Sequence, residues 1–504
     1  MVKILEGMFS IVIYDQEKNI CYFFRDRFGI KPLYFFESEE KIVFSSEIKP
    51  LLNYSVKKVN SKKMLDFFLK QSMDDDIFTL FENIYSIQPG YCGQVSQNKM
   101  KQERYWEFET TNNSNFNLKQ EKSNIESLFS SSVKKHLISD REVGFFFSGG
   151  TDSLSILSKA KKFLKNPKLF TYNFLSNDGK FYGEYEKAKQ ISSNLKLNLD
   201  ITTVTPKMIT ENFDKVIDVC ESPITSIRQI CDFLLFKRFK KLNIPVAIIG
   251  HGGDELLGGY DYNFLNFLID KYKGNLNCNK FLNDLISYID LKGKKDKDKK
   301  VKLMNHIITL SYQFGSTKDC TPFIEIENFS KDLLDEYIDE KFYAEKKIPK
   351  YNYLQNSQMR DIQHVSLPRN LKCCDRLSMS NGIEARVPFL DHKLANYLFN
   401  LDNKYKFKEN QTRWIFKSLF NKEISKYFSK KKNSVPDPQS LWLKNDLKEF
   451  FMDEFKSKKF QDSKFFNSKK INKSLEKFNK NETRSSFHLF QIFTFQKFLN
   501  HFKI

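Results

Sequence analysis

The sequence has few cysteines, few tryptophans and no recognisable set of metal ligands. Its 504 residues include 8 Cys and 3 Trp. No two cysteines form a Cys-x-x-Cys pair, and none has histidines beside it at the spacing of a zinc site. This scatter argues against a disulfide scaffold and favours buried, reduced thiols. Cys373 and Cys374 are adjacent, and a disulfide between neighbouring residues is geometrically awkward.

Two further absences concern membranes and export. No run of about 18 apolar residues is present to span a bilayer. The first residues alternate as a strand does, without the basic, apolar and small-residue segments of an export signal. We therefore expect no membrane partner and a cytoplasmic location.

The net charge of +20 raises nucleic acid as a candidate partner. The basic residues are mostly Lys mixed with Asp, Glu and Asn, and even the densest run, at 292–302, contains acids. Proteins that bind phosphates and bases favour the forked guanidinium of Arg, which is the rarer residue here. We expect no nucleic-acid partner.

The length of the chain predicts at least two domains, because single cores stop growing near about 250 residues. Residues 1–109 favour β-structure, residues 110–121 form a polar linker, and residues 122–504 form a second domain. Turn residues separate four expected strands in the first domain: Phe9–Tyr14, Ile20–Phe24, Leu33–Phe36 and Lys41–Ser45.

The second domain begins with helices that alternate with short apolar strands. This alternation predicts an α/β fold with a parallel sheet covered on both faces. From about residue 262 the pattern is mostly helical. The expected helices are 122–136, 153–164, 184–195 and segments within 206–242, and the expected strands are Val143–Phe147, Leu169–Phe174, Leu199–Val204 and Val246–Ile249.

A Gly-rich loop at 148–153 joins the first of these strands to a helix. In a parallel sheet, anions bind beyond the carboxyl ends of the strands, where helix amino termini present free N–H groups. The loop therefore predicts a pyrophosphate site in which Asp152 holds Mg²⁺, although a structural turn would also fit. The predicted ligands are Ser148, Gly149, Gly150, Thr151, Asp152 and Ser153.

A second Gly-rich loop, GHGGDELLGGY at 250–260, also follows a strand and also carries acids. Two such loops in one sheet are expected to face the same nucleotide. Asp152 and Asp254 would then share one metal ion.

Together the loops resemble the synthetase domain of the glutamine-dependent asparagine synthetase family. That family joins a class II glutamine amidotransferase domain to an ATP pyrophosphatase-type synthetase domain. Similar motifs are LPRNL at 367–371 and DRLSMSNGIEARVPFLD at 375–391. In the first domain they are RDRFGIKPLY at 25–34 and SEIK at 46–49, and the resemblance covers about residues 5–445.

The resemblance implies an adenine-nucleotide α-hydrolase-like fold with a helical C-terminal extension, preceded by a truncated Ntn-hydrolase-like α+β sandwich. It also implies a ligase reaction. The side-chain carboxylate of aspartate attacks ATP to give β-aspartyl-AMP and pyrophosphate, and ammonia then displaces AMP. ATP and Mg²⁺ are the implied cofactors, aspartate and ammonia or glutamine the substrates, and a homodimer the implied assembly.

Matching family positions imply roles for further residues. The backbone at Phe147, Asn173, Ile249 and Gly250 would hold the nucleoside. His251 stands where some members have a glutamate proposed as the base that receives the proton of ammonium, and histidine titrates in a suitable range. Hydrogen bonding to the loop backbone is the other interpretation of His251. Thr151 replaces a residue that is usually aliphatic.

Further charged positions are also candidates by this resemblance. Lys432 would contact the phosphates, although its Lys-rich surroundings are equally typical of a solvated surface. Glu384 is a candidate catalytic residue, and an equally weighted interpretation gives it and Arg386 a structural role. Glu255, Arg376 and Arg386 are candidate substrate-binding residues.

Complete members of the family begin Met-Cys-Gly, and the exposed Cys is the glutaminase nucleophile. Here the resemblance begins near Leu5, and Cys21 and Cys92 are internal. We expect no glutamine hydrolysis by the chain as written. Either the sequence is a fragment, or the protein uses free ammonia or a separate glutaminase subunit.

Two other functions remain open at this stage. Related proteins amidate sugar or peptide carboxylates of the cell surface, and the loops do not distinguish these acceptors from aspartate. A non-catalytic nucleotide-binding remnant is the other alternative, motivated by the departures at Thr151 and His251.

Overall fold

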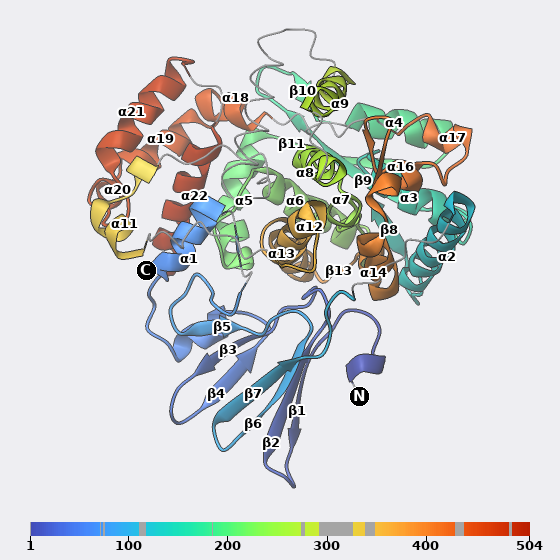
Figure 1. The fold of residues 1–504 in the computed structure, drawn as a ribbon. Coiled ribbons are helices and arrows are strands. Elements are labelled where there is room, and N and C mark those ends of the chain that lie inside the picture. The colour runs from blue at the N-terminus through green and yellow to red at the C-terminus, as the bar shows by residue number, and fades with distance from the viewer. Residues whose placement is uncertain are drawn as a thin grey trace.

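A computed structural model describes residues 2–70, 72–73, 76–109, 117–183, 185–273, 278–291, 326–337, 348–428, 438–482 and 486–504. These residues form a small β-rich unit and a larger α/β unit (Figure 1). The β-rich unit is blue in Figure 1 and lies below the larger unit. Within the described ranges, no helix combines the length and apolarity needed to cross a bilayer.

The β-rich unit consists of two antiparallel sheets, with strand orders β1-β2-β6-β7 and β4-β3-β5. Phe23 and Phe35 come from different sheets and both pack against Phe44, with ring centroids 5.3 and 6.2 Å apart. The four strands predicted here are confirmed, each end within one residue. The strands are β1 (Ser10–Asp15), β2 (Ile20–Arg25), β3 (Tyr34–Glu37), β4 (Ile42–Ser45), β5 (Ile84–Ser86), β6 (Tyr91–Ser96) and β7 (Lys99–Arg104).

Short helical segments connect this unit to the rest of the molecule. Phe68 packs against Phe495, and Phe81 packs against Phe498, with ring centroids 5.1 and 5.4 Å apart. The first unit therefore shares its core with the C-terminal end of the chain. The segments are η1 (Val2–Ile4), η2 (Lys49–Asn53), α1 (Ser61–Leu65) and the π-helical η3 (Asp66–Lys70).

The larger unit is built on a six-stranded sheet of order β10-β9-β8-β12-β13, with β11 also paired to β9. All strand pairs except β10 with β9 are parallel, as the sequence predicted. The edge strand β13 was not predicted. The strands are β8 (Val143–Phe146), β9 (Lys168–Leu175), β10 (Phe181–Tyr182), β11 (Leu199–Val204), β12 (Val246–Ile248) and β13 (Glu384–Arg386).

The order of these strands creates a switch point. From β8 the chain moves outward to β9 and β11, and it then returns to place β12 on the opposite side of β8. Because parallel crossovers are right-handed, the helices of the two directions cover opposite faces of the sheet. The crevice beyond the carboxyl ends of β8 and β12 is where open α/β sheets bind ligands.

Helices cover both faces of this sheet. Phe239 of α6 packs against Phe146 and Phe170, with ring centroids 5.5 and 4.1 Å apart. The helices up to the end of the sheet are α2 (Leu118–His136), α3 (Thr151–Ala160), α4 (Tyr185–Asn194), α5 (Pro206–Cys220), α6 (Arg228–Lys241), α7 (Gly253–Leu257), α8 (Asp261–Tyr272), α9 (Cys278–Leu291), η4 (Ile326–Asn328), α11 (Lys331–Tyr337), α12 (Tyr353–Gln363) and α13 (Ser366–Met379).

Helix α2 begins earlier than the sequence predicted. The predicted linker extended to residue 121, but the helix begins at Leu118. The reason is a cap: the side chain of Asn117 accepts a hydrogen bond from the backbone N–H of Gln120.

The remaining described chain is mainly helical, as predicted from about residue 262 onward. The last helix carries apolar residues on all sides and is buried accordingly. The elements are η5 (Pro388–Leu390), α14 (His392–Asn400), α15 (Asn403–Lys406), β14 (Phe407–Lys408), β15 (Gln411–Thr412), α16 (Trp414–Lys417), α17 (Lys422–Ser425), α18 (Gln439–Lys444), α19 (Lys448–Lys456), α20 (Lys458–Gln461), α21 (Ser468–Asn479) and α22 (Phe487–Phe502).

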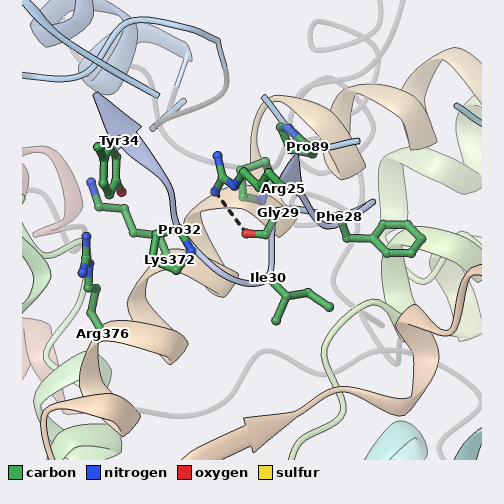
Figure 2. A pocket seen from close by; sticks show the side chains of 10 residues that line it. Arg25, Phe28, Gly29, Ile30, Pro32, Tyr34, Pro89, Lys372 and Arg376 are labelled. Atoms are coloured by element: carbon green, nitrogen blue, oxygen red, sulfur yellow. Dashed lines mark hydrogen bonds between the residues drawn. The ribbon is translucent and has the colours of Figure 1, made fainter. Parts of the chain in front are cut away.

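Helix α13 contributes charged contacts between the two units. Lys31 of the β-rich unit pairs with Asp375 at 2.7 Å. Arg376 pairs at 3.0 Å with Glu221, whose carboxylate accepts hydrogen bonds from the backbone N–H groups of Ile48 and Lys49 in the β-rich unit. Figure 2 shows a small pocket at this contact, where Tyr34 of the β-rich unit lies beside Lys372. Its volume of about 20 Å³ has room for about one water molecule.

The cysteines agree with the expectation of buried thiols. Five of the six described cysteine side chains are buried, and Cys21 is partly exposed. Cys320 lies outside the described residues, as does the side chain of Cys278.

Candidate active site

The two Gly-rich loops meet at the carboxyl edge of the sheet. A Cβ atom on Gly253 would lie 2.7 Å from Cγ of Asp152, and one on Gly250 would lie 3.2 Å from Cβ of Asp152. Side chains at these positions would push the loops apart, so the glycines of the second loop make room for the aspartate of the first.

The first loop leads directly into helix α3. Gly149 has φ of +70°, a backbone conformation that glycine adopts readily. Ser148 Oγ accepts a hydrogen bond from the Gly150 N–H at 3.2 Å and lies 3.4 Å from Ser153 Oγ. Gly150 precedes the helix without a side-chain cap. The positive end of the α3 dipole is therefore available to an anion.

Asp152 and Asp254 face the same cation, Arg413. Nη1 of Arg413 lies 2.9 and 3.1 Å from the two carboxylate oxygens of Asp152, and 2.7 Å from Oδ1 of Asp254. The Arg413 side chain is 5% exposed, whereas the side chains of Asp152 and Asp254 are 18% and 15% exposed. The structure thus brings both predicted metal ligands to one point.

Two carboxylates at one point suit Mg²⁺, which is commonly bound by one or two carboxylates together with phosphate oxygens. The described part of the chain contains no cluster of three or more His, Cys, Asp or Glu side chains able to hold a metal without such help. Asp152 and Asp254 therefore fit a metal that arrives with a phosphorylated substrate.

Lys417 adds a second basic group to this cluster. Burial, with help from the neighbouring Arg413, lowers the pKa of Lys417 to about 7, while Asp152 and Asp254 oppose this shift. The sequence reasoning missed both Arg413 and Lys417, which lie far from the loops along the chain. The signal available was a pair of basic residues spaced one helical turn apart after a tight turn at Glu409 and Asn410.

His251 lines a cavity of about 290 Å³ beside the second loop. Burial lowers the pKa of His251 to about 4, so its imidazole is neutral at pH 7 and is a weak base. The sequence suggested a histidine that accepts protons near neutral pH, and the lowered pKa of His251 does not favour that role.

The same cavity is lined by charges of both signs. Arg228 and Arg369 are cationic, and Asp232 lies among them. Burial raises the pKa of Asp232 to about 7, and the charge of Arg228 opposes the rise. The sequence placed Arg369 in the LPRNL motif without a role, and it did not single out Arg228 or Asp232, because the three residues come from separate helices, α6 and α13.

The predicted nucleoside positions lie along the same edge. Asn173 is 4% exposed, and within the described ranges its side-chain Oδ1 has no hydrogen-bond partner. A buried acceptor in this state suits a ligand donor. Phe147 and Ile249 donate their backbone N–H groups to the carbonyls of Phe170 and Arg386, so these N–H groups belong to the sheet.

The structure does not bring Glu384 or Arg386 to the loops. Glu384 pairs with Val246 at the start of β12, and so lies at the opposite edge of the sheet from the second loop. Arg386 donates to Glu384 at 2.7 Å and to the carbonyls of His136 and Ile138 at 2.8 and 2.6 Å. These bonds tie β13 to the end of α2, which is a structural role.

Glu255 and Arg376 also have structural contacts. Glu255 is 3% exposed and accepts hydrogen bonds from Tyr260 at 2.7 Å and from Ser366 at 2.8 Å. Arg376 lies between the two units, where its guanidinium is 5.3 Å from the centre of the Tyr34 ring. The prediction for Lys432 lies outside the described residues.

Neither described cysteine of the β-rich unit is activated as a nucleophile. Burial raises the pKa of Cys21, and it also raises that of Cys92 with help from Glu103. A thiol with a raised pKa carries less of the reactive thiolate.

The fold and the paired loops define a two-unit protein whose larger unit is a parallel α/β domain with an anion-suited site at its switch point. The chain belongs to the asparagine synthase family. The asparagine synthase family model matches residues 124–500, and a glutamine amidotransferase domain model matches residues 1–106.

Named relatives agree with this assignment. Asparagine synthetase [glutamine-hydrolyzing] 1 of Bacillus subtilis is 25% identical, over 88% of this chain and 70% of the relative. Asparagine synthetase [glutamine-hydrolyzing] 2 of the same organism is 27% identical, over 78% of this chain and 50% of the relative. The chain is also 21% identical to the amidase chry2 of Gibberella zeae, over 87% of this chain and 70% of that protein.

Proposed function

We propose that the chain is an ATP-dependent ligase that converts aspartate and ammonia into asparagine, with release of AMP and pyrophosphate. The observation that carries this proposal is the convergence of Asp152 and Asp254 on Arg413, beside the amino terminus of α3 and at the switch point of the sheet. Such a site suits a metal-bound polyphosphate.

In the first step, a carboxylate oxygen of the acceptor attacks the α-phosphorus of ATP. The bond between the α-phosphorus and the bridging oxygen breaks, and pyrophosphate leaves with the electron pair. Mg²⁺ held by Asp152 and Asp254 would neutralise charge on this leaving group. The N–H groups at the start of α3 and the hydroxyls of Ser148 and Ser153 would hold its oxygens.

In the second step, ammonia attacks the activated carbonyl carbon and AMP leaves. Adenylation is needed because a free carboxylate offers no good leaving group. His251, neutral at pH 7, would hydrogen-bond in this step rather than take the proton of ammonium. The nitrogen source must then deliver uncharged ammonia.

The cavity beside His251 favours aspartate as the acceptor. Its lining carries Arg228 and Arg369 for carboxylates, and Asp232, which is ionised above its pKa of about 7, for an ammonium group. An amino acid offers both charges, whereas a sugar acid offers only the negative one. The mixed lining therefore supports aspartate over a sugar carboxylate.

The direct test is to incubate the purified chain with Mg-ATP, ammonium salt and aspartate, and to measure asparagine, AMP and ADP. We expect equal amounts of asparagine and AMP. ADP as the nucleotide product would contradict the reaction class, and AMP formed only with another carboxylate would replace the acceptor. Nucleotide binding without turnover would instead favour the non-catalytic alternative.

A further inference from the structure

We propose that Arg413 competes with the metal ion for the Asp152–Asp254 pair. Its guanidinium binds both carboxylates until a metal-bound triphosphate arrives. The metal then takes its place on the carboxylates, and the guanidinium binds the phosphates. This inference rests on the proposed use of Mg-ATP. It concerns a residue of this chain that the two loops do not contain, and it can be tested without the reaction.

The contacts of Arg413 use the oxygens that a shared metal would need. One nitrogen, Nη1, lies within 3.1 Å of both oxygens of Asp152 and 2.7 Å from Oδ1 of Asp254. A magnesium ion requires direct contact with carboxylate oxygens at about 2.0–2.1 Å in near-octahedral geometry. The guanidinium and a metal shared by both carboxylates therefore exclude one another.

The local backbone aims Arg413 at this point. Arg413 has φ of +57°, in the left-handed region, between strand β15 and helix α16. The hairpin before it packs through Phe407 against Gly258, where a Cβ atom would lie 2.7 Å from the Phe407 ring. The second loop and the hairpin are thus in contact, and this packing fixes the position of Arg413 beside the loops.

The guanidinium is also placed to reach the phosphates. Nη2 of Arg413 lies 3.4 Å from Oγ1 of Thr151, inside the predicted pyrophosphate loop. Nε of Arg413 is buried and has no hydrogen-bond partner within the described ranges. A planar guanidinium binds phosphate oxygens in pairs, so a short movement would exchange one anionic partner for another.

Charge explains why such an exchange is useful. One guanidinium compensates only one of the two carboxylate charges, and without any cation the two carboxylates would repel each other. A divalent ion would neutralise both. Arg413 can therefore hold the pair together before the nucleotide arrives, and the triphosphate then provides the guanidinium with a new anionic partner.

The first experiment measures metal binding alone. Mn²⁺ is titrated into nucleotide-free protein and followed by electron paramagnetic resonance, comparing wild type with R413Q. We expect R413Q to bind Mn²⁺ at least about tenfold more tightly, since 1.4 kcal/mol of lost competition corresponds to that factor. Equal or weaker binding by R413Q would overturn the proposal.

R238Q is the matched control, because Arg238 holds Asp200 with two nitrogens at a site away from the loops. Its Mn²⁺ affinity should equal that of wild type. A chain that binds Mn²⁺ in this way but makes no asparagine would keep this inference and reject the proposed function.

A second measurement covers the case in which R413Q folds poorly. The melting temperature of R413Q should fall in EDTA and rise again with MgCl₂, by more than that of wild type, because the metal replaces the missing cation. The double variant R413Q/D254N, with one carboxylate neutralised, should lose this response. Identical responses to MgCl₂ in wild type and R413Q would contradict the proposal.

Discussion

Two buried arginines, Arg376 and Arg413, each pair with carboxylates, but the surroundings of the two ion pairs differ. Arg376 lies between the two units and pairs with Glu221, whose oxygens also accept hydrogen bonds from the backbone N–H groups of Ile48 and Lys49 at 2.8 and 2.7 Å. Arg413 lies between two aspartates that remain partly exposed. The carboxylate of the first cluster is closed to solvent, whereas the two carboxylates of the second cluster remain partly exposed.

This difference in exposure distinguishes a structural role for Arg376 from a functional role for Arg413. Glu221 has no exposed side-chain surface, so its carboxylate is not accessible to a metal or another ligand. The Arg413 cluster presents partly exposed carboxylates at the carboxyl ends of β8 and β12. Motif membership would have ranked them the other way, because Arg376 belongs to a conspicuous family motif and Arg413 does not.

The largest expected effect is on the closed cluster. R376M leaves Glu221 buried without its cation, and we expect the free energy of unfolding to fall by about 3–5 kcal/mol. Urea denaturation of the purified variant measures this. R238M, which breaks a partly exposed pair, should cost no more than about 1 kcal/mol. If R376M also lost no more than about 1 kcal/mol, the Arg376 cluster would not stabilise the contact between the units.

The next effect is on activity. D152N removes one of the two carboxylates that converge on Arg413, and we expect AMP formation to fall about 10²–10³-fold, as when one preorganised electrostatic contact is lost. The protein should remain folded by circular dichroism. D200N, at the partly exposed aspartate held by Arg238, should keep wild-type activity. Equal losses in the two variants would remove the functional assignment of the Arg413 cluster.

A smaller effect concerns the pH dependence of stability. Asp232 has its pKa raised from an ordinary value near 3.8 to about 7 by burial. Between these values the folded chain keeps a proton that the unfolded chain has lost, so this group makes stability fall as pH rises from about 4 to 7, by up to about 1.4 kcal/mol per unit.

The variant D232N lacks this group, so the stability of wild type relative to D232N should decrease across that range. Urea denaturation at pH 5 and pH 7 tests the sign. Parallel profiles for the two proteins would mean that Asp232 is not held in a desolvated site.

The smallest effect is expected at the edge of the sheet. E384Q breaks an ion pair in which the Glu384 side chain is 47% exposed. We expect less than about 1 kcal/mol of lost stability and an unchanged rate of AMP formation. A drop in rate comparable to that of D152N would restore Glu384 as a catalytic candidate. It would also mean that the reaction takes place near β13 rather than at the two loops.

The periodic parts of the fold were predictable from sequence. Strands such as Leu199–Val204 were placed at the observed residues, because short apolar runs between helices have few other stable arrangements. The features of the fold that the sequence did not predict depend on single side-chain contacts or on strand pairing. Asn117 caps a helix that composition placed in a linker, and β13 exists because its three residues pair with β12.

The glycines and acids of the two loops are enough to predict from sequence where an anion and a metal would bind. Each loop follows a strand of the parallel sheet, so both loops are expected at the carboxyl ends of neighbouring strands. Only the tertiary structure decided which other charges share that place. Arg413 and the cavity residues Arg228, Asp232 and Arg369 come from distant segments, and burial sets their electrostatics. Local sequence carries no record of the distances and desolvation that give these residues their roles.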